Sequence, residues 1–187
     1  GNALEVKEAI DLLRGHGPAD LEELSVCLTA HMLLLARKCS TYQQGSQQVQ
    51  KILSSGAGFD KFCALVTAQE GRLDYQLPFY GLPQAKLQSD VQAAEDGYVA
   101  AIDAMEVGRA AMLLGAGRER LGDRIDPAVG IQVLKKHGDQ VFTGEVIARI
   151  YANDARRMQT AVQSIQGCYH LQREKPPSQA LILQTVR

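Results

Sequence analysis

Two glutamates near the start of the chain are spaced so that they could act together. Glu5 and Glu8 lie three residues apart, and on a helix this spacing places both carboxylates on one side. Such a pair could hold a cation or serve as an acid and a base. Acidic residues in a first helical turn also stabilise the helix by interacting with its dipole. The residues by themselves favour this second interpretation, a solvated helix flank.

The histidines and cysteines do not form a recognisable catalytic or metal-binding set. His31 falls beside Cys27 on the apolar face of a predicted helix, so a hydrogen-bonded core histidine is the expected role. The other histidines stand in predicted turns or loops, without a partner at triad spacing; they are His16, His137 and His170. The cysteines match no C-x-x-C pattern, which favours reduced thiols in a cytosolic setting; they are Cys27, Cys39, Cys63 and Cys168.

A glycine- and arginine-rich segment begins at Leu114-Gly115-Ala116-Gly117-Arg118. It superficially resembles a phosphate loop, but a dinucleotide fingerprint follows a strand, whereas this segment follows a predicted helix and its third glycine comes too late. The glycines are therefore interpreted as a helix C-cap and a tight turn. The arginines of the segment could pair with the nearby aspartates or bind an anion from another domain, and the sequence leaves both open. These arginines are Arg118, Arg120 and Arg124, and the aspartates are Asp123 and Asp126.

The bulk composition bounds the class of protein. The chain has 187 residues, of which 45% are hydrophobic and 22% charged, as in an ordinary globular protein. Its 20 basic and 21 acidic side chains leave a net charge of −1, without the basic patch that nucleic acid or a membrane surface requires. No apolar run approaches the ~20 residues of a membrane helix. We therefore expect neither nucleic acid nor a membrane as a partner.

The first part of the chain is predicted to be helical. Apolar side chains recur at helical spacing over residues 3–14, 17–38, 41–53 and 57–69, and glycine, serine or proline marks the ends of these segments. The apolar face of the second segment includes Leu28, Met32 and Leu35, which we expect to face the core. Residues 73–84 hold three aromatic residues and two prolines, which is typical of a connector. Residues 1–84 therefore form the first predicted domain.

From residue 85 onward the apolar pattern alternates, as in strands. Strands are predicted over residues 86–93, 97–102, 130–134, 145–150 and 180–186, with helices over 105–114 and 154–165. Gly138-Asp139 and Gly144 provide turn chemistry between the strands that flank them. Residues 85–187 are therefore predicted to form a β-rich C-terminal module.

This module also resembles the half-barrel of biotinyl and lipoyl carrier domains. The shared patterns are D-G-Y-V at residues 96–99 and G-D-Q-V-x-x-G-E at residues 138–145. Carriers present a lysine at a hairpin tip as the attachment point, whereas the nearest counterpart here is Ala104-Met105-Glu106. Because glutamate stands where lysine is required, we expect the strand scaffold without the carrier function.

Six motifs in series resemble the C-terminal part of the thymidine phosphorylase and pyrimidine-nucleoside phosphorylase family. They cover nearly the whole chain in the right order, so the set is far more specific than any one of them. The motifs are G-N-A-L-E-V-x-E-A-I at residues 1–10, G-x-G-P-x-D-L at 15–21, D-G-Y-V at 96–99, L-G-A-G-R at 114–118, I-D-x-A-V-G at 125–130 and G-D-x-V-x-x-G-E at 138–145.

The resemblance implies an α+β chain that is part of an α/β enzyme. Its helical residues, 1–84, would belong to the large α/β domain, and residues 85–187 would form an α/β-hammerhead-like module. The implied enzyme is a cytoplasmic homodimer that cleaves thymidine with phosphate as co-substrate, giving thymine and 2-deoxyribose 1-phosphate; broader members also accept uridine. The alternative from the residues alone is a stand-alone, non-catalytic hammerhead scaffold or binding module.

The resemblance also implies where the site residues are. The family's phosphate loop and base-binding residues precede the position that matches Gly1, so no catalytic or substrate-binding residue is expected here, and the chain alone is expected to be inactive. No cofactor is required. The broader bacterial members bind a potassium ion partly through a glutamate that matches Glu8. Because hard cations prefer oxygen ligands, the resemblance favours Glu8, and not Glu5, as a ligand of the ion.

Overall fold

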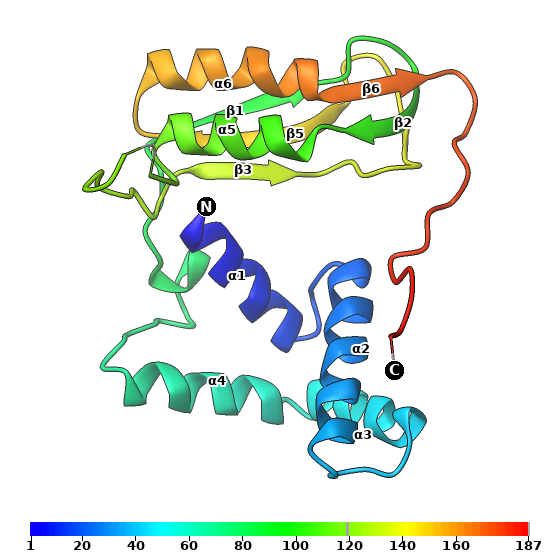
Figure 1. The fold of residues 1–187 in the computed structure, drawn as a ribbon. Helices are drawn as coiled ribbons and strands as arrows, with labels where there is room; N and C mark the ends of the chain where they lie inside the picture. The colour runs from blue at the N-terminus through cyan, green and yellow to red at the C-terminus, as the bar shows by residue number, and fades with distance from the viewer. Residues whose placement is uncertain (119, 187) are drawn as a thin grey trace. The chain divides into compact units, whose positions relative to one another are not determined.

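All four helices predicted for the first part of the chain are present in the structure, a computed structural model that describes residues 1–118 and 120–186 (Figure 1). They are α1 (Asn2–Leu13), α2 (Ala19–Leu35), α3 (Tyr42–Ser54) and α4 (Ala57–Ala68). Local chemistry sets their ends. Gly15 ends α1 with a φ of 80°, and the Thr41 hydroxyl caps α3 by accepting a hydrogen bond from the Gln44 N–H at 3.2 Å.

The residues divide into two compact units. The helical unit comprises Val6–Gly81 and the residues from Ala180 onward. The sheet unit comprises Gly1–Glu5 and Leu82–Gln179. Within the helical unit, α2 and α3 pack closely at Gly45, where an added Cβ would lie 3.0 Å from the Ala30 carbonyl oxygen and 3.1 Å from the Cys39 sulfur. The absence of a side chain at this position lets the two helices approach.

The predicted apolar face of α2 is wrong in part. Leu28, Met32 and Leu35 are 56%, 66% and 84% exposed, whereas the buried side chains of this helix are Val26, Cys27 and Ala30. Because α2 is apolar around most of its circumference, periodicity does not distinguish the face that packs from the one that does not. The close contact with α3 selects the smaller side chains.

Two antiparallel sheets form the sheet unit. The first has the strand order β1-β5-β3, and the second has the order β4-β2-β6. Their strands are β1 (Leu87–Gln92), β2 (Gly97–Ile102), β3 (Gly130–Val133), β4 (Gln140–Val141), β5 (Val146–Ala152) and β6 (Tyr169–Gln172). Helices α5 (Ala104–Leu114) and α6 (Ala155–Cys168) pack against each other, and α6 also packs against β1 and β5 (Figure 1).

The core of the sheet unit lies between these helices and the strands. Its fully buried side chains include Val91, Val99 and Val141 from three strands and Ile165 from α6. Alternate residues of the strands point inward, which agrees with the alternating pattern of the sequence. The α+β class is therefore confirmed, and none of the described helices is long and apolar enough to cross a membrane.

At the C-terminal end, one strand prediction is wrong and one strand was not predicted. No strand forms over residues 180–186, and the chain instead forms β6 directly after α6, where it pairs with β2. The segment 180–186 has the apolar residues of a strand, but a strand requires a partner, and the described neighbours offer none. Tyr169 makes β6 part of the core. Its hydroxyl donates its proton to the Ile147 carbonyl at 2.8 Å, and the Lys135 carbonyl lies 3.2 Å away as a second, weaker acceptor of the same proton.

Candidate functional site

The two glutamates of α1 are both exposed but differ in their partners. Glu5 lies within 3.8 Å of the amino group of Gly1, with 81% of its side chain exposed. Glu8 forms no hydrogen bond or ion pair with any residue in the described ranges. The next acid on the helix, Asp11, pairs with Lys7 at 2.5 Å. Glu8 is therefore an exposed carboxylate of α1 without a partner among the described residues.

The connector that follows α4 contacts the polar face of α1. The connector includes the short 3₁₀ segment η1 (Pro78–Gly81), and the Tyr80 hydroxyl donates a hydrogen bond of 2.5 Å to Asp11. The Arg14 guanidinium lies over the Tyr80 ring at 5.5 Å. Burial, and then the hydrogen bond with Asp11, raises the pKa of Tyr80 above its ordinary value. We call Asp11, Arg14 and Tyr80 the connector clasp.

The backbone of this connector is strained. Phe79 and Tyr80 have φ values of 56° and 55°, a left-handed conformation that is uncommon for bulky residues. Each such residue costs about 1–3 kcal/mol and persists only where the surroundings impose it. The clasp imposes it at Tyr80, and the Lys7 ammonium lies 5.5 Å from the centre of the Phe79 ring. Sequence reasoning noted the aromatic content of the connector but not this role.

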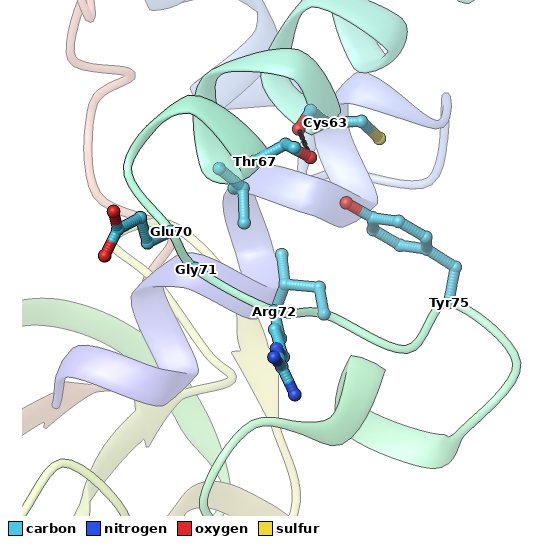
Figure 2. A pocket seen from close by; sticks show the side chains of 8 residues that line it. Cys63, Thr67, Glu70, Gly71, Arg72 and Tyr75 are labelled. Atoms are coloured by element: carbon cyan, nitrogen blue, oxygen red, sulfur yellow. Dashed lines mark hydrogen bonds between the residues drawn. The ribbon is translucent and has the colours of Figure 1, made fainter.

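A pocket of about 780 Å³ lies at the end of α4 (Figure 2). Its side chains come from α4 and from the segment after it, including Cys63, Thr67, Glu70, Arg72 and Tyr75. Figure 2 shows the Tyr75 ring directed toward α4, while Glu70 and Arg72 point in different directions. A hydrogen bond with the Cys63 thiol, together with burial, raises the pKa of Tyr75 to about 12. Because no histidine or carboxylate contacts the thiol in this pocket, it lacks the base that an activated cysteine needs.

The histidines do not assemble a catalytic centre. The predicted core histidine, His31, is only partly buried, and its ring stacks on Tyr42 with 4.8 Å between the ring centroids. A hydrogen bond with Cys27, and then burial, raises the pKa of Tyr42. Among the described residues, His31 therefore has a tilted ring contact with Tyr42, with 39° between the ring planes, in place of the predicted hydrogen bond.

The glycines after α5 act as predicted. Gly115 is the C-cap of α5 with a φ of 104°, and its carbonyl accepts a hydrogen bond from the Asp126 N–H at 2.9 Å. The segment therefore closes a helix and is not a dinucleotide loop. At the other end of α5, the Asp103 carboxylate caps the helix by accepting hydrogen bonds from the backbone N–H groups of Met105 and Glu106. The tripeptide Ala104-Met105-Glu106 thus lies in a helical turn and not at the hairpin tip that a carrier domain needs.

The described residues show no arrangement that holds a metal ion. No group of three His, Cys, Asp or Glu side chains is arranged to hold a metal ion within residues 1–118 and 120–186. The thiols of all four cysteines are free, with Cys27 and Cys168 buried. Evidence for a function therefore comes from the relatives of the whole sequence.

Comparison with known proteins identifies such relatives. Residues 98–172 match the pyrimidine nucleoside phosphorylase C-terminal domain. Over 153 residues, 82% of this chain, the sequence is 46% identical to the pyrimidine-nucleoside phosphorylase of Bacillus subtilis and 45% identical to that of Geobacillus stearothermophilus. The corresponding protein of Staphylococcus aureus strain USA300 is 41% identical over the same length. The chain spans about a third of the length of these relatives, since the match covers 35% of each.

Proposed function

Because the chain belongs to the pyrimidine-nucleoside phosphorylase family, as its C-terminal portion, we propose that it contributes to an enzyme that cleaves thymidine with phosphate. The products are thymine and 2-deoxyribose 1-phosphate. The observation that carries the proposal is the 46% identity with the Bacillus subtilis relative, which extends beyond the C-terminal domain into the helices.

In the proposed reaction, phosphate attacks C1′ of the sugar as positive charge builds on the ring and the pyrimidine leaves. Stabilising that charge and the leaving base requires preorganised charged and hydrogen-bonding groups. The residues that supply these groups in the family precede the position of Gly1, so the role proposed for this chain is structural. The 187 residues alone are inactive in this proposal, and the complete enzyme is a cytoplasmic homodimer that requires no organic cofactor.

For the proposed enzyme, we assign Glu8 to a potassium ion. A potassium ion prefers oxygen donors, and Glu8 presents an exposed carboxylate without a described partner. One carboxylate does not make a site, so the remaining oxygen ligands come from other parts of the enzyme. The ion pair of Asp11 with Lys7 supports the choice of Glu8 over Asp11, and the family resemblance supports the choice of Glu8 over Glu5.

A chimeric enzyme tests the proposal. The chain is joined downstream of the part of the Bacillus subtilis relative that it does not match, and thymine release is measured with and without phosphate. Each half alone is the control. Phosphate-dependent release by the chimera, but by neither half, is the expected result, and uridine in place of thymidine measures the substrate range. A folded chimera that releases no base would overturn the proposal and favour a non-catalytic scaffold.

The cation assignment has its own matched variants. In an active chimera, Glu8→Gln should raise the potassium concentration needed for half-maximal activity, whereas Glu5→Gln should leave it unchanged. An equal effect of both substitutions would show that α1 contributes general negative charge and not a ligand.

A further inference from the structure

The loop that follows α5 and the start of α6 gather arginine side chains around a pocket of about 440 Å³ in the sheet unit. Its lining includes Arg120, Arg124 and Arg157, with Asp123 as the one acid. Arg157 comes from α6, more than thirty positions along the chain from the other two. The pocket therefore depends on the tertiary fold, and the sequence segment alone contains only part of it.

The acids near this pocket are engaged with the loop itself. Asp123 accepts a hydrogen bond from the backbone N–H of Arg120 at 2.7 Å. Asp126 accepts one from the Ala128 N–H at 3.0 Å and another from the Asn153 side chain at 2.7 Å. These bonds hold the shape of the loop.

The guanidinium groups of the pocket remain available. Within the described part of the chain, Arg120, Arg124 and Arg157 form no ion pair, and three positive charges line the pocket with one acid, Asp123. Asp154 also lies near Arg157: the backbone hydrogen bond from Arg157 and then the Arg157 charge lower the pKa of its carboxyl. The pocket thus carries an excess of positive charge, and its shape is set by neighbouring acids.

Two glycines at the end of α5 also belong to the lining of the pocket. Gly115 and Gly117 both line it, and a Cβ added at Gly115 would lie 3.9 Å from the terminal nitrogen of Arg157. The guanidinium therefore lies close to the backbone at the end of α5. This approach brings the Arg157 side chain to the same pocket as the arginines of the loop.

The geometry points to a binding site for a phosphoryl dianion in this pocket, separate from the phosphorolysis proposed above. Planar guanidinium groups bind the oxygens of phosphate through paired, charge-assisted hydrogen bonds, and several arginines can surround one tetrahedral group. The volume suits inorganic phosphate or the phosphate of a small sugar. Every lining residue belongs to this chain, so binding does not depend on the catalytic part of the enzyme.

Titration of the 187-residue chain tests this assignment. Inorganic phosphate and ribose 5-phosphate are added separately at low ionic strength, and backbone amide shifts are followed by NMR. We expect saturable shifts of the Gly115 and Gly117 amides, which weaken as sodium chloride is raised because salt screens the attraction. Tighter binding of ribose 5-phosphate would identify a sugar phosphate as the ligand, and equal binding would identify phosphate alone.

Charge-removing variants separate the pocket from general surface charge. Arg124→Gln and Arg157→Gln should each weaken binding about tenfold, since each removes a charge-assisted hydrogen bond. Arg156→Gln is the matched control, because Arg156 neighbours Arg157 on α6 but does not line the pocket. Shifts that do not saturate, or equal weakening by Arg156→Gln, would overturn the assignment. Amide spectra that keep their native dispersion show that a variant remains folded.

Discussion

The connector clasp leads to a quantitative prediction about stability. The Tyr80 hydroxyl donates to Asp11 at 2.5 Å, and Asp11 also pairs with Lys7 through its other oxygen. Tyr80→Phe removes the hydroxyl and keeps the ring under Arg14. Asp11→Asn keeps the shape of the acceptor and removes its charge. Tyr80→Phe therefore removes its hydrogen bond to Asp11 with little change in packing, whereas Asp11→Asn weakens both that bond and the ion pair with Lys7.

The expected size follows from the exposure of the partners. A hydrogen bond to a charged group contributes about 1.5–3 kcal/mol when buried, and both partners here are only partly buried. Solvent screening lowers the contribution, so Tyr80→Phe should reduce the free energy of unfolding by about 1 kcal/mol. The loss should be retained at neutral pH. The loss should diminish as pH rises above 10.0, the ordinary tyrosine pKa. Above that pH the unfolded chain releases the Tyr80 proton, whereas the folded protein, with its raised pKa, still holds it. The contribution of the hydroxyl to stability therefore falls until the folded protein also loses the proton.

Urea unfolding of the wild type, the two single variants and the double variant gives the coupling energy directly. We expect a coupling of about 1 kcal/mol between positions 80 and 11. Tyr98→Phe is the control, because the Tyr98 hydroxyl has no hydrogen-bond partner among the described residues. A coupling below about 0.3 kcal/mol, within the error of additivity, would refute the clasp as a stabilising contact.

Three further predictions concern the core and the thiols. Burial raises the pKa of Tyr169 to about 12, so Tyr169→Phe should remove part of the tyrosinate absorbance that appears near pH 12. The same substitution should destabilise the protein by about 1–2 kcal/mol at neutral pH. An unchanged alkaline titration would contradict this prediction. Gly45→Ala should lower the free energy of unfolding by about 1–3 kcal/mol, because the added methyl group pushes α2 away from α3. Gly108→Ala should stabilise the protein by up to about 1 kcal/mol, because Gly108 lies in α5 with open space around it. Thermal unfolding compares the two variants, and equal losses of stability would argue against close packing at Gly45. Of the four thiols, the two buried ones should react with dithionitrobenzoate only after unfolding, and for Cys168 burial also raises the pKa of the thiol; four rapidly reacting thiols would contradict the burial.

The sequence by itself determined the local features of this protein. Glycine at position 15, threonine at 41 and glycine at 115 end or begin helices through bonds to residues a few positions away, so their types predict the helix boundaries. The alternating pattern predicts β2 and β5 because one face of each is buried. The family was predictable as well, since six spaced motifs retain their order along the chain.

Tertiary structure decided which residues meet. The strand predicted at 180–186 is absent and β6 is present, because a strand forms only where another strand offers free backbone groups. Leu28 and Met32 are exposed because packing between α2 and α3 selected another face of an apolar helix. Contacts over long sequence separations join Tyr80 to Asp11 and place Arg157 and Arg124 in the lining of one pocket. Spacing along the chain carries no information about such contacts, since their energy depends on the approach of distant segments.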